Sequence, residues 1–343
     1  MWVGLIFFFV SSHWKALYTE WLGDRSPLKK IETEPDMVQP GLLMEEKSAE
    51  EESSEVGTDL LMRQTLLGAL FPGLYAGSMW KRCSLLFVEA LGCCLLGIYL
   101  PIMMGFDESI LISMFLVSVP LSQRLAVLLE ENRHNIWVKQ MAGWDVNRNT
   151  GLCLLCMFLG VLGGYLAAVL VSSSSIQMVT SFDFALEAAN AKQGTILTRN
   201  FSGFLPIFGH NLSVLLVLSF LCFVYRSYGA MLGLVWNACV WVAVLTVLTQ
   251  RAMIVSEMPS WQFGLIAFCA VIPHLLIEGI AYIFGSMAGI FFSQGLMRYD
   301  LSEGRFMKVL KACLGLLVVA VTLIFLGAAT EAKFATFMLE FLK

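Results

Sequence analysis

Long apolar runs separated by short polar connections dominate the chain from about residue 80 onward. Each run is close to the length that an α-helix needs to cross the hydrocarbon core of a membrane. The apolar residues are continuous rather than alternating, which favours helices over a β-barrel. The pattern therefore predicts an all-α, polytopic helical membrane bundle with about seven transmembrane helices. The expected spans lie near 83–105, 109–129, 151–172, 208–225, 229–248, 262–293 and 311–330.

The sixth apolar run is too long for a simple crossing. About thirty residues rise roughly 45 Å along a helix, whereas the hydrocarbon core is about 30 Å thick. Pro273 lies near the middle of the run and removes one backbone hydrogen bond. We therefore expect this helix to be kinked at Pro273, or to be broken there into two half-helices, the second of which would begin at His274.

Several polar side chains interrupt the apolar runs. His274 and Glu278 are one helical turn apart, so they share a helix face and can share a proton. A charged side chain at the centre of a bilayer costs roughly 2.5–3.5 kcal/mol on insertion scales. Asn211, Asn237 and Glu331 also lie in or at the end of apolar runs. Either these groups fix the bundle through interhelical hydrogen bonds, or they form a proton, substrate, catalytic or partner site.

Small residues form two stripes that favour close helix contact. Gly160, Gly163 and Gly164 lie in the third apolar run, and Gly285 and Gly289 are four residues apart in the sixth. Glycines at this spacing let the backbones of two membrane helices approach each other. We therefore predict that both stripes are packing faces.

The first 150 residues have a different organisation. Residues 1–60 begin with about ten apolar residues, too few to span a membrane, and then become polar and strongly acidic. We expect an interfacial N-terminal segment followed by an acidic flexible tether. Residues 61–150 are expected to add a membrane region with two spans and a cytoplasmic loop at 130–150.

Composition supports a membrane protein and narrows its chemistry. The 343 residues are 58% hydrophobic and 14% charged, whereas a soluble protein has about 25% charged residues. The 9 cysteines lie mostly in apolar segments, so Cys153 and Cys156 are expected to be lipid-buried thiols. No loop is long enough for a catalytic domain, and no Walker A, zinc-ligand or nucleophile-elbow motif is present. We assign no catalytic residue, metal ion, cofactor or nucleic-acid partner.

Basic residues gather on one side of the predicted bundle. This asymmetry predicts a cytoplasmic N-terminus and, after seven spans, a C-terminus outside the cytoplasmic (inner) membrane. The residues on the predicted cytoplasmic side are Lys81, Arg82, Arg133, Lys139, Arg148, Arg226, Arg298, Arg305, Lys308 and Lys311.

Four short motifs resemble the stage II sporulation protein M family over roughly residues 150–335. The family's Pro-His-Gly-x-x-Glu-Leu-Pro-Ala resembles Pro-His-Leu-Leu-Ile-Glu-Gly-Ile-Ala at 273–281. Its Asn-Asn pair resembles His-Asn at 210–211, and its Asn-Gly-x-x-x-Gly region resembles 228–237. Its closing alanine and glutamate resemble 328–331. The order and spacing of the four motifs agree with the family.

This resemblance implies a helical membrane domain over 151–343 in which Asn237, His274, Glu278 and Glu331 converge. The family's namesake holds a peptidoglycan-degrading complex at the membrane during spore formation. We therefore expect a non-enzymatic subunit that scaffolds a cell-envelope complex. The alternatives are a permease-type subunit of an ABC-exporter-like complex with a separate ATPase, and an intramembrane enzyme that uses His274 and Glu278. The expected partners are the lipid bilayer, other membrane or envelope proteins, a cytoplasmic ATPase on the permease hypothesis, or further copies of this chain.

Overall fold

The computed structural model describes residues 78–106, 109–137, 139–181, 204–255 and 260–341. For residues 248, 251–255, 260–261, 263–267, 270–271 and 331–341 it describes the backbone alone. The described residues form seven helices and no strand, which confirms the predicted all-α class. The N-terminal segment and tether predicted for residues 1–60 lie outside the described residues. The helices are α4 (Met79–Met103), α5 (Ser109–Trp137), α6 (Gly143–Val171), α7 (Ser173–Thr180), α10 (Phe204–Val255), α11 (Ser260–Arg298) and α12 (Gly304–Phe341).

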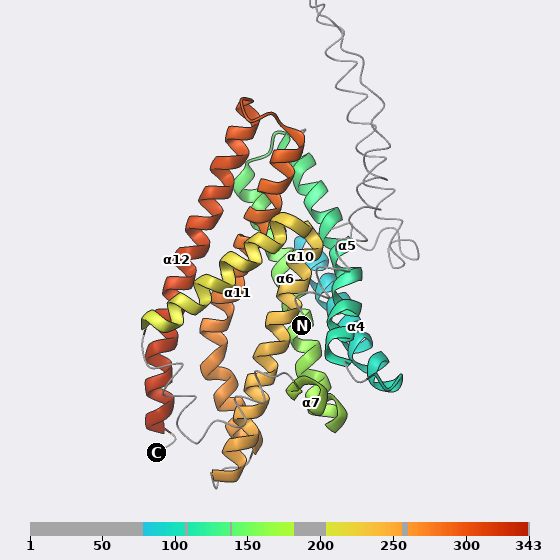
Figure 1. Cartoon of the computed structure of the whole chain (residues 1–343), viewed down its shortest axis with the longest axis vertical. Coiled ribbons are helices and arrows are strands. Elements are labelled where there is room, and N and C mark those ends of the chain that lie inside the picture. Colours follow the sequence, from blue (N-terminus) through green and yellow to red (C-terminus); the bar gives the residue numbers. More distant parts are fainter. Residues whose placement is uncertain (1–77, 107–108, 138, 182–203, 256–259, 342–343) are drawn as a thin grey trace, which may run out of the picture. The chain divides into compact units, whose positions relative to one another are not determined.

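Six of the described helices are long and apolar enough to cross a membrane, as expected of a multi-pass membrane protein. The sequence predicted about seven spans, and the two numbers differ because α10 contains two of the predicted spans. Its backbone leaves the helical region at Arg226 (φ 52°, ψ −129°), and Figure 1 shows two legs that diverge from this bend. The legs are roughly 33 and 44 Å long at 1.5 Å per residue, so each is long enough to cross the hydrocarbon core.

Two glycines allow the legs of α10 to lie close together beside the bend. A Cβ atom on Gly229 would lie 2.4 Å from the carbonyl oxygen of Leu221, and one on Gly233 would lie 2.1 Å from Leu218 Cδ1. Both distances are below van der Waals contact. The tight turn therefore depends on the missing side chains at these two positions.

Helix α11 continues through Pro273 as a single element from Ser260 to Arg298. The alternative of two half-helices is therefore wrong, and His274 does not begin a helix. The prediction of a cytoplasmic loop at 130–150 also needs correction. Helix α5 extends to Trp137 and α6 begins at Gly143, so most of this segment is helical.

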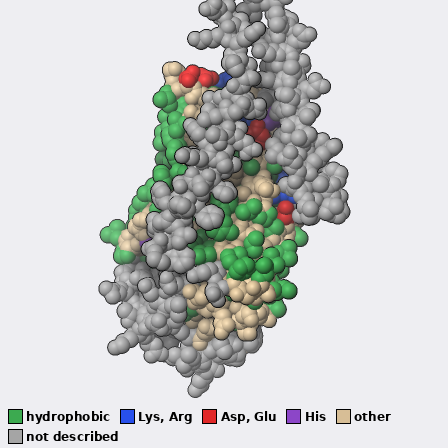
Figure 2. Space-filling model, turned by 45° about the vertical axis from the view of Figure 1, so that its right-hand side comes forward, with side chains coloured by type: hydrophobic (Ala, Val, Ile, Leu, Met, Phe, Trp, Pro, Cys, Tyr) green, Lys and Arg blue, Asp and Glu red, His purple; other side chains and the backbone are tan. Residues whose placement is uncertain are grey.

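The described helices pack into one compact unit (Figure 1). Helix α11 packs between α10 and α12, while α4 packs against α5 and α6. Helix α10 joins the two groups because it also contacts α5 and α6. Most of the buried side chains that they share are apolar. Figure 2 shows hydrophobic side chains over much of one outer face, with the visible charged side chains gathered in its upper half.

Candidate functional site

Glu278 is the centre of a polar junction between three helices. Its side chain on α11 is 5% exposed, and its Oε1 atom accepts a hydrogen bond from the Nδ2 atom of Asn211 on α10, which is 8% exposed. Helix α12 approaches from another side, because a Cβ atom on Gly327 would lie 3.3 Å from Glu278 Cγ. The structure thus brings together two of the predicted polar residues, although they are far apart in sequence.

His274 lies one turn before Glu278 on α11, as its spacing requires. It is half-buried, and its Nδ1 atom is buried without a hydrogen-bond partner among the described residues. This Nδ1 atom therefore does not form the predicted contact between His274 and Glu278.

Asn237 and Glu331 are placed less directly. The Nδ2 atom of Asn237 donates to the carbonyl oxygen of Gly233, one turn earlier in the same helix, at 2.7 Å. Its amide thus bonds its own backbone. Glu331 follows Gly327 by four residues on α12, which puts its backbone on the helix face that approaches Glu278. The side chain of Glu331 lies outside the described atoms.

The two glycine stripes pack as predicted, with one exception. A Cβ atom on Gly160 would lie 2.4 Å from Phe87 O, and one on Gly164 would lie 2.6 Å from Cys94 Cβ, so α4 and α6 touch at both positions. At Gly163 the nearest atoms are 3.8 Å away, which is ordinary contact. Gly285 and Gly289 face the first leg of α10, where Cβ atoms would lie 2.4 Å from Leu215 Cδ1 and 2.3 Å from Ser219 O, respectively.

A buried ion pair between α4 and α5 was not predicted. Arg124 Nε lies 2.8 and 3.0 Å from the two carboxylate oxygens of Glu89, and the side chains are only 4% and 10% exposed. Each residue interrupts an apolar run, and the two have opposite charge. Two opposite charges in neighbouring spans could have predicted this ion pair from the sequence, since a lone charge in a membrane helix needs a partner.

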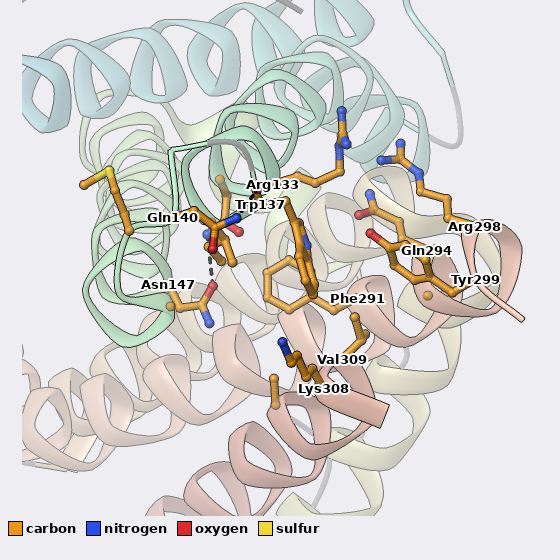
Figure 3. Close-up of a pocket in the computed structure, with 16 residues that line it drawn as sticks. Arg133, Trp137, Gln140, Asn147, Phe291, Gln294, Arg298, Tyr299, Lys308 and Val309 are labelled. Carbon is orange, nitrogen blue, oxygen red and sulfur yellow. Dashed lines mark hydrogen bonds between the residues drawn. The ribbon is translucent and has the colours of Figure 1, made fainter. Parts of the chain in front are cut away.

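A pocket of about 300 Å³ lies at another part of the bundle, between the ends of α5, α6, α11 and α12 (Figure 3). It is lined by three basic side chains, by aromatic and aliphatic groups, and by amides, and none of the lining residues is acidic. The lining residues are Asn132, Arg133, Ile136, Trp137, Gln140, Met141, Gly143, Asn147, Phe291, Gln294, Gly295, Arg298, Tyr299, Lys308, Val309 and Ala312.

One glutamate beside this pocket holds two of its basic groups. Glu130 Oε1 accepts from Arg133 Nε at 2.9 Å, and Glu130 Oε2 lies 3.5 Å from Arg298. Figure 3 shows Arg133 and Arg298 at one edge of the pocket and Lys308 on the opposite side. Lys308 is exposed and makes no ion pair with a described residue. Three positive charges and one negative charge therefore surround the pocket.

No three of the described His, Cys, Asp and Glu side chains lie close enough together to hold a metal ion. Comparison of the chain with protein-family models, with curated proteins and with solved structures finds no match. What the chain does must therefore be argued from these residues.

Proposed function

We propose that the chain is a non-enzymatic integral membrane subunit that scaffolds a cell-envelope complex, as its resemblance to the stage II sporulation protein M family implies. The burial of Glu278 is the observation that supports this proposal. Its carboxylate joins α11 to α10 through Asn211 and packs beside Gly327 of α12. A catalytic acid or base must reach its substrate. A carboxylate that is 5% exposed at a helix junction is better suited to hold helices together.

The outer faces of the helices provide surface for partners. On α12, Leu314, Val318 and Phe325 recur at helical spacing, and their side chains are at least half exposed. In the membrane this stripe contacts either lipid or a helix of another protein. A scaffold would use such a stripe to bind the membrane helix of its partner.

The same proposal gives the chain an orientation in the cytoplasmic membrane. The bend of α10 and the connections between α5 and α6 and between α11 and α12 lie where basic residues are frequent. Side-chain contacts hold the α5–α6 connection and the α11–α12 connection together at one end of the bundle. Trp137 packs on Tyr299 at 5.9 Å, and Arg298 pairs with Glu130. We infer that this end is cytoplasmic, with the C-terminus on the outer side.

A permease-type subunit is the second candidate. The observation that favours it is the helical hairpin of α5 and α6, which extends beyond the predicted spans at residues 130–150. A rigid hairpin with exposed Met141 and Trp144 could transmit force from a separate ATPase. Reversing the charges at Arg133, Asp145 and Arg148 on this hairpin would then abolish association with the ATPase.

Purification of the tagged chain in mild detergent, with its partners identified by mass spectrometry, tests both candidates. Envelope enzymes or other membrane proteins without an ATPase would support the scaffold, whereas an ATPase would support the permease. Purification of the chain alone or as a homo-oligomer would contradict both.

Two variants make the test specific. Leu314→Trp with Val318→Trp alters the exposed stripe of α12 and should release the partner, whereas Leu96→Trp on the exposed face of α4 is the matched control. Glu278→Gln retains an oxygen that accepts from Asn211, so the scaffold should keep its partners. If Glu278→Gln instead abolished a turnover while the complex stayed assembled, the chain would be an intramembrane enzyme.

A further inference from the structure

The pocket at the ends of α5, α6, α11 and α12 has the character of a site for an amphiphile. Trp137 and Phe291 supply apolar walls, while Gln140 and Gln294 supply amide groups (Figure 3). The basic side chains lie on two opposite sides of the same space. A ligand that fits this lining has a compact anionic group and an apolar part.

The position of the pocket fits the surface of a membrane. It lies beside the short connections between Trp137 and Gly143 and between Arg298 and Gly304, where transmembrane helices end. Trp137 and Tyr299 pack together there at 5.9 Å. Tryptophan and tyrosine are enriched at the level of lipid headgroups because one part of each ring system is polar. The pocket can thus be reached from the headgroup layer.

The charges beside the pocket are not balanced. Glu130 is shared by Arg133 and Arg298, and Lys308 has no ion pair with a described residue. Among the basic residues that line the pocket and Glu130, three positive charges and one negative charge leave an excess of two. The adjoining connection carries Asp300 and Glu303, of which Glu303 pairs with Arg305. Arg226 adds to this excess, because its side chain contacts Met297 beside Arg298. The local charge therefore favours a ligand with one or two negative charges.

The volume of the pocket limits the size of the ligand. A volume of about 300 Å³ is at the lower end of ligand-binding pockets, so it accommodates a headgroup rather than a whole phospholipid. The acyl chains would then lie outside it. Exposed apolar side chains are available beside the pocket for this purpose, among them Leu296, Met297 and Met307.

We propose that this pocket binds the phosphate-bearing headgroup of an anionic phospholipid, with Lys308 and Arg298 on the phosphate and Trp137 against the glycerol region. The site is independent of the scaffold function, because it depends on none of the residues at Glu278. Such a bound lipid joins the turn between α5 and α6 to the turn between α11 and α12.

Native mass spectrometry of the whole chain, titrated with phosphatidylglycerol or with phosphatidylcholine of the same acyl chains, tests the proposal. The wild-type chain should bind phosphatidylglycerol more tightly. Lys308→Gln should weaken phosphatidylglycerol binding about fivefold, since a basic side chain near an anionic lipid contributes about that factor. Binding of phosphatidylcholine should not change.

Lys311→Gln is the matched control. Lys311 lies on the same helix and is also exposed, but it does not line the pocket. Equal losses in the two variants, or equal binding of the two lipids by the wild-type chain, would overturn the proposal. Displacement of phosphatidylglycerol by millimolar inorganic phosphate would show a site for a soluble anion and would also overturn the lipid assignment.

Folding of the variant is not an obstacle, because Lys308 is exposed and has no ion pair with a described residue to lose. An unchanged melting temperature for Lys308→Gln in the absence of added lipid establishes that its fold is intact. Lys308→Glu should then weaken phosphatidylglycerol binding further, because it replaces attraction with repulsion. Unaltered binding by Lys308→Glu would also contradict the proposal.

Discussion

The contact between α4 and α6 allows a sharp test, because three glycines on one helix are predicted to respond differently to the same substitution. A methyl group added at Gly160 would lie 2.4 Å from the carbonyl oxygen of Phe87 and 2.9 Å from Ala90 Cβ. Neither atom can rotate away, so the two helices must move apart. At Gly163 the same methyl group would lie 3.8 Å from its nearest neighbours, Leu91 and Phe87, and no movement is needed.

The expected magnitudes follow from two opposing terms. Overpacking a well-packed contact costs about 1–3 kcal/mol, and replacing a helical glycine by alanine returns about 1 kcal/mol. Gly160→Ala should therefore destabilise the chain by up to about 2 kcal/mol. Gly164→Ala should have a similar effect, because its methyl group would lie 2.6 Å from Cys94 Cβ. Gly163→Ala should be neutral or slightly stabilising.

Thermal unfolding in detergent, followed by tryptophan fluorescence, measures the difference. At about 2–4 °C per kcal/mol, Gly160→Ala and Gly164→Ala should each lower the melting temperature by several degrees relative to Gly163→Ala. Cys94 offers an independent signal, because it is fully buried against Gly164 and should react faster with a maleimide when the helices separate. Equal melting temperatures for all three variants, or the lowest one for Gly163→Ala, would refute the packing of α4 on α6.

Three further outcomes are expected, each measured by the same thermal unfolding. Glu89→Leu and Arg124→Leu should each destabilise the chain by about 3–5 kcal/mol, since each removes one member of a buried ion pair, and the double variant should recover most of the loss; additive losses would exclude the pair. Glu278→Ala or Asn211→Ala should cost about 1–3 kcal/mol by removing a hydrogen bond between buried groups, whereas Glu278→Gln should be close to wild type; an unchanged melting temperature for both alanine variants would contradict the junction. Arg226→Gly should stabilise the chain by about 1 kcal/mol, because residue 226 at the bend of α10 has a backbone conformation that glycine adopts readily. Arg226→Val should destabilise the chain. A higher melting temperature for Arg226→Val than for Arg226→Gly would contradict the bend.

The hydropathy pattern alone was sufficient to predict the helical class, because a backbone in lipid has few ways to satisfy its hydrogen bonds. A helix satisfies every internal backbone hydrogen bond, so an apolar run of sufficient length predicts one. The same argument is weaker at helix ends. Residues 130–137 and 143–150 are polar, a pattern that a loop and a helix leaving the membrane both allow, and the structure places them in α5 and α6.

Partners across helices were harder to predict than the helices themselves. Spacing along one helix offered His274 as a partner of Glu278, but it could not show that the packing of α10 brings Asn211 to that carboxylate. Spacing also grouped Gly163 with Gly160 and Gly164, because it does not specify how closely each position of α6 approaches α4. These choices depend on how each helix is rotated about its axis, and that rotation is set by tertiary packing.

The Glu278 junction and the basic end of the bundle differ in the free energy needed to rearrange their polar contacts. This difference bears on where partners bind. Separating Asn211 from Glu278 would break a hydrogen bond between two buried groups, so that junction favours a fixed arrangement. The pairs of Glu130 with Arg133 and Arg298 are partly exposed, and such pairs exchange with water at little cost. Regulation by a ligand requires a region that can change its contacts. We therefore expect lipid or protein partners to act on the basic end of the bundle, with the Glu278 junction keeping α10, α11 and α12 in register.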